Sequence, residues 1–482
     1  MFNISFNIVD AIFCINILLA MSVIFFERKN PSTTWAWIMI MLFVPVVGFI
    51  LYIIIGQDMR KRKTFTKKEE EDRYLALLHA QETRLSYHLS EFKDAVTKSS
   101  QSVIRLHLVG HQSLYTDDNN VTIYTTGKDK FEHMFEAIEN AKEYIHIEYY
   151  IIRPDKLGDR LKSLLIQKAK EGVRVLLLYD DMGCIRTKKS YFKELKTAGV
   201  QIACFFPSIV PLLKLRLNYR NHRKICVVDG ETAFLGGFNI GVEYLGKNKK
   251  LGYWRDTHLQ IKGSAVAMIN LQFLLDWRFA TKENISLTQY IRNDIKPSQS
   301  QTGIQIVSSG PDSSHSSILN GYVKMINEAK QSIYIQTPYF IPDDGLFTAL
   351  KLAALSGIDV HIMIPNKPDH PFVYWATYSY IGELVRYGIK CYTYEKGFLH
   401  AKTLIIDEKI CSVGTANFDI RSFKLNFEIN AFIYDQKVAC DLTLAFREDL
   451  KDCREITHDI YQNRSAIIKF KESISRLLSP IL

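Results

Sequence analysis

A pattern of histidine, lysine, aspartate and glycine occurs twice in this chain with the same spacing. The first copy lies in "NHRKICVVDGETAFLGG" at 221–237 and the second in "LHAKTLIIDEKICSVGT" at 399–415. Both follow His-x-Lys-x4-Asp-x6-Gly, and the matching residues are His222, Lys224, Asp229 and Gly236, then His400, Lys402, Asp407 and Gly414. Residues two apart on an extended segment point to the same face, so each histidine and its lysine can meet one ligand.

Two histidine-lysine pairs suit a reaction at a phosphodiester. One histidine can attack phosphorus as a nucleophile while a second, protonated histidine gives its proton to the leaving oxygen. The lysines would compensate the negative charge of the phosphoryl group without a metal ion. The duplication therefore predicts one active site that takes a histidine from each copy.

Further residues are expected to complete this site. An asparagine follows each motif glycine at the same offset, and small residues beside it would let donors approach a ligand closely. The predicted substrate-binding set is Asn239, Asn417, Gly236, Gly237, Gly414 and Thr415. Each histidine also needs an orienting carboxylate, for which Asp256 and Glu428 are the candidates.

The motif aspartates belong to the predicted catalytic set, but we expect Asp229 and Asp407 to hold the turn of their own motif together. A lone histidine on a strand is more often a core residue than a catalytic one, but the duplicated spacing argues against that interpretation here. Lysine beside each histidine, rather than clustered carboxylates, disfavours a metal site. No Gly-rich phosphate loop follows a strand, so we expect neither a metal nor a cofactor.

The segments around the motifs also repeat. "AIENAKEYIHIEYYIIRP" at 137–154 is echoed by "MINEAKQSIYIQTPYFIP" at 325–342, each reading as helix, strand and turn. Alternating helices and strands predict an α/β fold with two similar units, largely parallel sheets and a boundary within the polar segment 281–303. We place the first catalytic half at 103–290 and the second at 291–482.

The N-terminal region predicts a membrane anchor. Ala11–Phe26 has no charged residue and Trp35–Gly56 forms a second such run, so 1–59 reads as two transmembrane helices without a cleaved signal peptide. A charged linker at 60–102 follows, and the basic cluster at its start places the catalytic body on the cytoplasmic side of the cell membrane.

The net charge indicates which classes of partner the protein binds. The formal charge is +10 with a pI near 8.9, which favours nucleic acid, phosphorylated substrates or acidic lipid. Basic residues just before the first motif are candidates for headgroup contacts, and they are Lys214, Arg216, Arg220 and Arg223. The C-terminal segment 466–482 predicts a partly amphipathic helix that touches the membrane or docks on the body.

The paired motifs resemble the signature of the phospholipase D superfamily. "RNHRKICVVDGETAFLGGFNIGVEYLG", "YWRDTHLQI" and "HAKTLIIDEKICSVGTANFDIRSFKLNFEINAFIYD" are similar to the bacterial cardiolipin synthases of that superfamily, and so is the two-helix anchor. The resemblance implies one active site at the interface of two phospholipase D-like units. It also implies transphosphatidylation of two phosphatidylglycerol molecules to cardiolipin and glycerol through a phosphatidyl-histidine, with His222 as nucleophile and His400 as acid and later base.

Other functions stay open at this point. A phospholipase D-type hydrolase or a phosphatidylserine synthase would differ only in which hydroxyl takes up the phosphatidyl group. A nuclease of the same fold fits the charge, but the predicted membrane helices argue against nucleic acid as a partner. A membrane scaffold without activity is disfavoured by two intact motifs. The oligomeric state is left open by the sequence.

Overall fold

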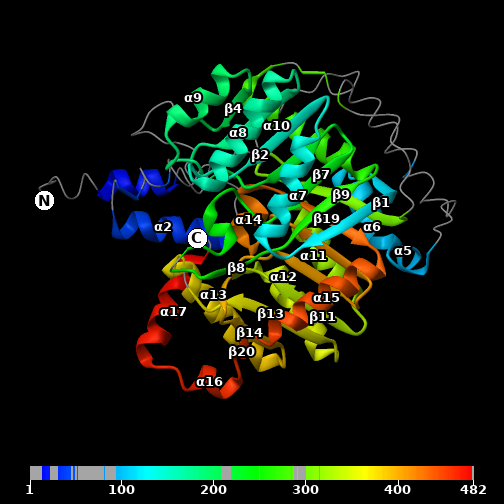
Figure 1. The fold of residues 1–482 in the computed structure, drawn as a ribbon. Coiled ribbons are helices and arrows are strands. Elements are labelled where there is room, and N and C mark those ends of the chain that lie inside the picture. Colours follow the sequence, from blue (N-terminus) through cyan, green and yellow to red (C-terminus); the bar gives the residue numbers. More distant parts are fainter. Residues whose placement is uncertain are drawn as a thin grey trace, which may run out of the picture.

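The computed structural model describes residues 13–21, 31–44, 47–48, 52, 81, 94–207, 219–248, 250–283, 285–286, 290, 300–313, 315–367 and 369–479. Figure 1 shows two α/β halves, one above the other, with a long sheet running through both. The sheet has sixteen strands among the described residues. Its continuous order places the strands of one half on each side of the β1–β10 pair, and β5 of the first half lies off this order and pairs with β19 of the second.

The first half is built around seven strands of this sheet in the order β1, β9, β7, β6, β2, β3 and β4. Its strands are β1 (Tyr115–Tyr124), β2 (Tyr144–Tyr149), β3 (Arg174–Asp180), β4 (Gln201–Phe205), β5 (Arg220–Asn221), β6 (Lys224–Val228), β7 (Thr232–Gly236), β8 (Tyr253–Arg255) and β9 (His258–Lys262). Its helices are α7 (Gly127–Glu139), α8 (Lys156–Lys170), α9 (Lys189–Thr197), the 3-10 helix η2 (Val242–Leu245) and α10 (Ala265–Thr281).

The second half repeats this plan in the order β10, β19, β17, β16, β11, β13, β14 and β20. Its strands are β10 (Thr302–Ser309), β11 (Ser332–Gln336), β12 (Phe340–Ile341), β13 (Asp359–Pro365), β14 (Lys390–Tyr394), β15 (Gly397–Leu399), β16 (Thr403–Ile406), β17 (Ile410–Gly414), β18 (Phe418–Asp419), β19 (Asn426–Tyr434) and β20 (Cys453–Glu455). Its helices are α11 (Ser317–Glu328), α12 (Asp344–Leu355), α13 (Pro371–Leu384), η4 (Val385–Tyr387), α14 (Ile420–Lys424) and α15 (Gln436–Leu450).

The repeated sequence produces the same local structure in both halves. β2 and β11 are largely buried strands that precede helices α8 and α12, and each helix begins at an aspartate cap. The Asp155 carboxylate accepts from the N–H of Leu157 and of Gly158, and Asp343 accepts from Leu346 N–H. Such caps satisfy backbone donors that the first helical turn leaves unpaired. The α/β prediction with two similar units is thus confirmed.

The sheets are mixed rather than largely parallel. β2, β3 and β4 are parallel in the first half, as are β11, β13 and β14 in the second. The motif strands β6 and β7, however, form an antiparallel hairpin, and β16 and β17 do the same. The prediction of parallel sheets is wrong here because a three-residue turn, rather than a helix, connects the motif strands, and so short a connection permits only antiparallel pairing.

The central core lies where the two halves meet. β1 pairs antiparallel with β10, with Tyr115 opposite Gln305. Inner side chains from both halves, with those of α10 and α15, form one buried cluster that includes Leu176, Ile225, Phe273, Ile405, Val413 and Phe446. The outer faces are covered by α7, α8 and α9 in the first half and by α11, α12 and α13 in the second. A shared apolar core therefore holds the two motifs in a fixed relation.

The start of the predicted first half packs on the second half. α5 (Ala95–Ser99) is followed by α6 (Gln101–His111), whose Val103 and Ile104 lie in the core of the second half. Gln305 of β10 donates to the carbonyls of Ile104 and Ser113. The chain thus passes over the second half before β1 enters the first.

The N-terminal segment contains two short helices. Residues 13–21 are helical and α2 spans Pro31–Phe43, and Asn16 Nδ2 donates to the Met41 carbonyl at 2.7 Å. The sequence predicts two transmembrane helices here, but α2 has 13 residues, and no helix within the described residues has the length and apolar character to cross a membrane. The remainder of the two predicted spans and most of the predicted linker 60–102 fall outside the described residues.

The C-terminal helix turns its apolar side outward. α16 (His458–Gln462) leads to α17 (Ala466–Leu478), which packs against α13. Glu472 of α17 is buried and its carboxylate accepts from Arg464 at 2.8 and 2.9 Å, whereas Ile467, Phe470 and Leu477 are exposed. The predicted amphipathic helix is present, and it docks on the body through its polar residues.

Candidate active site

Each motif histidine is held by a strand of the opposite half. β5, which leads into His222, pairs parallel with β19, and His222 N–H donates to the Phe427 carbonyl at 2.9 Å. β15, which leads into His400, pairs parallel with β8, and His400 N–H donates to the Arg255 carbonyl at 2.7 Å. These two cross-half strand pairs bring the histidines to one place.

Each candidate orienting carboxylate likewise belongs to the half opposite the histidine that it contacts. His222 Nδ1 lies 2.9 and 3.0 Å from the Glu428 carboxylate oxygens, and His400 Nδ1 lies 2.6 Å from Asp256 Oδ2. An ionised carboxylate only accepts, so Nδ1 of each ring carries the hydrogen. The unprotonated nitrogen of each neutral ring is then Nε2, which is free for attack or proton transfer.

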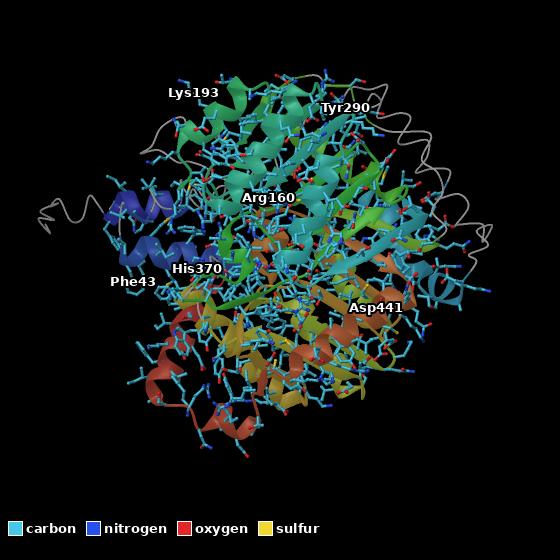
Figure 2. All side chains as sticks on the ribbon, viewed as in Figure 1. Phe43, Arg160, Lys193, Tyr290, His370 and Asp441 are labelled. Carbon is cyan, nitrogen blue, oxygen red and sulfur yellow. The ribbon has the colours of Figure 1, made fainter. Side chains whose placement is uncertain are left out.

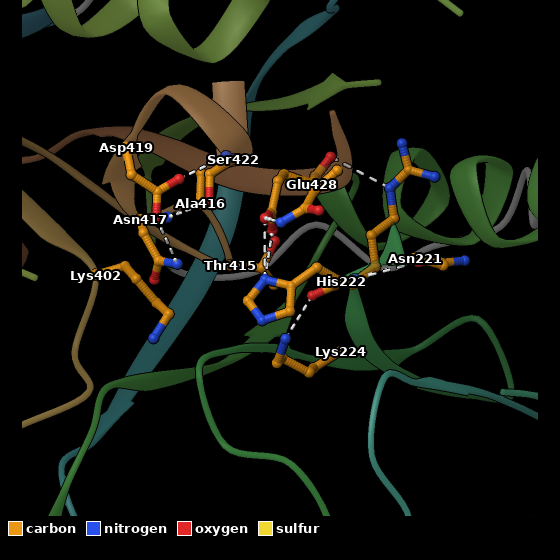
Figure 3. A network of polar contacts seen from close by, with 12 residues as sticks. Asn221, His222, Lys224, Lys402, Thr415, Ala416, Asn417, Asp419, Ser422 and Glu428 are labelled. Atoms are coloured by element: carbon orange, nitrogen blue, oxygen red, sulfur yellow. Dashed lines mark hydrogen bonds and ion pairs between the residues drawn. The ribbon is translucent and has the colours of Figure 1, made fainter. Parts of the chain in front are cut away.

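The two motif lysines are fully buried beside the histidines. Lys224 Nζ donates to the His222 carbonyl at 2.5 Å, and Lys402 Nζ donates to the His400 carbonyl and lies 2.8 Å from His400 Nδ1. Burial lowers the pKa of Lys224 to about 7 and that of Lys402 to about 8. Figure 3 shows Lys402 and Asn417 of the second half facing His222 and Lys224 of the first.

The protein groups around the site favour neutral imidazoles. Burial lowers the pKa of His222 to about 4, and Glu428 opposes this shift. Burial and Lys402 lower the pKa of His400 to about 4, against the effect of Asp256. Burial disfavours ionisation of Asp256, but His400 and Lys402 outweigh it and lower the pKa of this carboxyl. A bound phosphate anion would raise the histidine and lysine pKa values toward their ordinary range.

The motif aspartates are not brought to the histidines. The Asp229 carboxylate accepts from the backbone N–H groups of Lys142, Glu143 and Tyr144, each at 2.8 Å. Asp407 does the same for Lys330, Gln331 and Ser332, at 2.7 to 2.9 Å. Five residues along a strand correspond to about 16 Å, so each aspartate lies at the far end of its strand from the lysine. Their contacts fix the starts of β2 and β11 rather than the turn of their own motif.

The small residues of the motifs make room for neighbouring strands. A Cβ at Gly236 would lie 2.5 Å from His258 Cα, and one at Gly414 would lie 2.3 Å from Asn430 Oδ1. A Cβ at Gly237 would lie 1.9 Å from Asp256 Oδ1. The Thr415 hydroxyl accepts from Ile429 N–H at 2.9 Å. All four residues therefore contact the segments that carry the carboxylates and allow them to pack closely. The sequence had predicted that these residues contact the substrate.

The two asparagines do reach the cavity. Asn239 and Asn417 both line it, together with His222 and His400. Asn239 Oδ1 accepts from Ile151 N–H at 3.2 Å, and Asn417 Nδ2 donates to Asp419 at 3.3 Å. Asn417 Oδ1 is buried without a hydrogen-bond partner among the described atoms. A hydroxyl group of a substrate would satisfy it.

The cavity has a volume of about 650 Å³. Beyond the motif residues it is lined by aromatic, acidic and basic side chains, including Tyr150, Trp254, Tyr339, Asp369, Asp419, Arg220 and Arg421. His370, Pro371, Phe372 and Val373 at the start of α13 also line it, and Phe372 is 54% exposed. In Figure 2, His370 lies on the same side of the molecule as Phe43 of α2.

Two buried arginines support the carboxylates. Arg223 pairs with Asp276 of α10, and its Nε donates to the Glu428 carbonyl at 3.2 Å. Arg255 Nε donates to Asp449 at 2.8 and 3.0 Å. Sequence reasoning missed these partners, although a single acidic residue in the apolar run "NLQFLLDWRF" signals a buried charge that needs a cation.

The four basic residues that were predicted to contact headgroups have different positions in the structure. Lys214 and Arg216 lie outside the described residues, and Arg220 lines the cavity. Arg223 is 3% exposed, so the prediction that it meets lipid headgroups is wrong. It is adjacent to His222 on an extended segment, and alternation turns it to the opposite side.

A family profile described as "Cardiolipin synthase, PLD-like domain" matches residues 134–261 and 322–450. A relative that covers the whole chain, the major cardiolipin synthase ClsA of Bacillus subtilis (strain 168), is 50% identical over 484 residues, 100% of both chains. The chain belongs to the cardiolipin synthase family. Within this family, the cardiolipin synthase of Oceanobacillus iheyensis is 50% identical over 471 residues, 98% of each chain.

Two further comparisons concern the N-terminal segment and the fold. A profile described as "Phospholipase_D-nuclease N-terminal" matches residues 14–57, the region of the two short helices. Among solved structures, phosphatidylserine synthase of Haemophilus influenzae Rd KW20 superposes with a TM-score of 0.58 over 80% of this chain and 96% of that one. At 16% identity this likeness shows the fold alone.

Proposed function

We propose that this chain joins two phosphatidylglycerol molecules into cardiolipin and releases glycerol. The observation that carries the proposal is the pair of histidines from separate halves, each bonded at Nδ1 to a carboxylate of the other half and both lining one cavity. Full-length identity of 50% to curated cardiolipin synthases supports the substrate class.

In the first step, Nε2 of His222 attacks the phosphorus of the donor lipid. A P–N bond forms, the P–O bond to the terminal glycerol breaks, and protonated His400 gives its Nε2 proton to the leaving oxygen. Glu428 stabilises the positive charge on the phosphorylated ring. Lys224 and Lys402 compensate the charge of the phosphoryl oxygens in a buried setting, where each ion pair is strong.

In the second step, a hydroxyl of the other phosphatidylglycerol attacks the phosphorus. A P–O bond forms, the P–N bond to His222 breaks, and neutral His400 takes the hydroxyl proton through Nε2. Asp256 stabilises the resulting imidazolium, so the site returns to its starting protonation state. The nucleophilic role and the acid-base role are thus divided between the motif histidines of the two halves.

The N-terminal segment is proposed as a membrane anchor in the cell membrane, with the catalytic body on the cytoplasmic side. Apolar side chains of residues 13–21 and of α2 are exposed, among them Phe13, Leu18, Met21, Trp35, Leu42 and Phe43. Such an apolar surface favours lipid over water. The outward side chains of α17 add a second apolar surface with Lys469 and Lys471 beside it, as at a membrane interface.

Purified full-length protein in phosphatidylglycerol vesicles, without metal or nucleotide, tests the proposal by mass spectrometry of lipids and water-soluble products. We expect cardiolipin and free glycerol in equal amounts. Phosphatidic acid without cardiolipin would indicate a hydrolase instead. Added serine that is converted to phosphatidylserine in preference would indicate a phosphatidylserine synthase, and either outcome would overturn the proposal.

A further inference from the structure

The wall of the cavity differs between the two halves, although its centre is repeated. Arg220 lies two residues before His222, and the matching position before His400 is Phe398. Arg421 lies four residues after Asn417, and the matching position after Asn239 is Glu243. Arg220 and Arg421 both line the cavity. Neither arginine therefore has a cation at the matching position of the other half.

The two arginines come together through the cross-half strand pair. Arg220 of β5 is opposite Asn426 of β19, and α14, which carries Arg421, ends two residues before that asparagine. Tyr150 contacts His222, with the two ring centroids 5.1 Å apart. Burial raises the pKa of the Tyr150 hydroxyl, and Arg220 and Arg421 both oppose the rise, because their guanidinium groups lie near it.

Acidic side chains line the cavity as well, among them Asp419, two residues before Arg421. Glu243 lines it and lies 3.5 Å from Arg153, and Asp369 lines it and accepts from the Tyr339 hydroxyl. Carboxylates disfavour a second anion, whereas a guanidinium fork matches the oxygens of a phosphate. A second phosphate would therefore be placed at Arg220 and Arg421.

The spacing along β5 suits the acceptor lipid. Residues two apart on a strand share a face and lie about 7 Å apart, so Arg220 and His222 point the same way at that separation. In phosphatidylglycerol, the three-carbon glycerol separates the terminal hydroxyl from the lipid phosphate. A lipid held by Arg220 through its phosphate can extend its hydroxyl toward the phosphorus on His222.

We propose that Arg220 and Arg421 form a second phosphate site that holds the phosphodiester of the acceptor phosphatidylglycerol. The donor phosphate meanwhile lies at His222 and His400. This inference rests on the proposed function and specifies how the acceptor is recognised. The product, with two phosphates joined by one glycerol, would span both sites.

The test compares a charged acceptor with a neutral one. Wild type, Arg220→Gln and Arg421→Gln are incubated with phosphatidylglycerol vesicles alone or with added ethanol, which takes up the phosphatidyl group but has no phosphate. We expect each variant to lower the rate of cardiolipin formation about tenfold or more and to form phosphatidylethanol within about twofold of wild type. Arg421→Lys, which keeps the charge but not the fork, is expected between these limits.

Arg160→Gln is the matched control, since Arg160 is a half-exposed arginine of α8 with no part in the cavity lining. Its two rates are expected to match wild type. Equal loss of both products in the Arg220 and Arg421 variants, or no loss of either, would overturn the second phosphate site. If wild type formed neither cardiolipin nor phosphatidylethanol, the proposed function itself would fail.

Discussion

The two halves of the site reach the same histidine-carboxylate contact by different side chains. His222 meets the longer Glu428, and the residue after the motif glycine Gly414 is Thr415, whose hydroxyl accepts from Ile429 N–H. His400 meets the shorter Asp256, and the matching position is the glycine Gly237, where a Cβ would lie 1.9 Å from the carboxylate. Carboxylate length and the size of the neighbouring residue are thus coupled, so the halves are not interchangeable residue by residue.

Removing either histidine is the strongest way to separate the roles of the halves. We expect His222→Ala and His400→Ala each to lower cardiolipin formation on the order of a thousandfold or more, because each does a step that no other group can do. A donor with a p-nitrophenol leaving group, which leaves without a proton, distinguishes them. His400→Ala should still release a burst of p-nitrophenol and His222→Ala should not. The reverse result would assign the nucleophile to His400.

Neutralising Glu428 or Asp256 tests whether the contact between each histidine and a carboxylate of the other half affects the rate of cardiolipin formation. We expect Glu428→Gln and Asp256→Asn each to lower kcat by about 10- to 100-fold, since the imidazole loses the partner that fixes its tautomer and stabilises its charged form. The pH profile of kcat is the readout, and its acidic limb should move only if the carboxylate acts on the histidine. An unchanged profile with lower thermal stability would leave these residues a purely structural role.

A methyl group added at Gly237 should disrupt the contact between Asp256 and His400 and leave the contact between Glu428 and His222 intact. Gly237→Ala would displace Asp256 and lower kcat about tenfold or more. Thr415→Ala, at the matching position, removes one hydrogen bond to a buried N–H and should cost about 1–3 kcal/mol of stability with activity within about threefold. Steady-state kinetics with thermal unfolding checks both. Equal kinetic effects of the two changes would contradict the coupling of carboxylate length to neighbour size.

The buried lysines should make the free energy of unfolding depend on pH. Lys224 has a pKa lowered to about 7 by burial, so between about pH 7 and 10 the unfolded chain holds a proton that the folded chain lacks. Stability therefore rises with pH in that window, by about 1.4 kcal/mol per pH unit for each such group. Lys224→Met should reduce this slope and abolish activity.

Lys130 offers the matched control for that slope. It is fully buried outside the cavity lining, donates to the Tyr149 hydroxyl at 2.8 Å, and burial lowers its pKa to about 7. Lys130→Met should reduce the slope equally and keep activity within about twofold. Urea unfolding at pH 7, 8 and 9 measures it, and a slope unchanged in both variants would show that the lysines keep ordinary pKa values.

Much of the site could be predicted from the spacing of the motif residues, because each histidine and its lysine are only two residues apart. The identical offsets of His222 and His400 indicated a shared site, and the need of each histidine for an orienting carboxylate led to the candidates Asp256 and Glu428. The sequence could not show that the carboxylates cross between halves, because that depends on the pairing of β5 with β19 and of β8 with β15. These pairs join residues that are 206 and 144 positions apart in the chain, and local patterns do not specify them.

The fold followed from the repeat, but its sheet direction and its buried charges did not. Alternating helices and strands predicted α/β units, yet the hairpin between β6 and β7 is signalled only by Asp229 and Gly230, both with positive φ. Arg223 looked like a surface cation because its partner Asp276 is 53 residues away. Side chains that meet only in the folded core escape a search by local spacing.

The exchange of strands between the halves bears on the origin of the chain. A single ancestral half would have lacked both a carboxylate for its histidine and a strand to hold it, so it would have been active only as a two-fold dimer of identical subunits. Two halves on one polypeptide are free of that symmetry, because each can change without the other. Arg220 beside His222, where its sister position carries Phe398, is a change that a homodimer would have had to make twice.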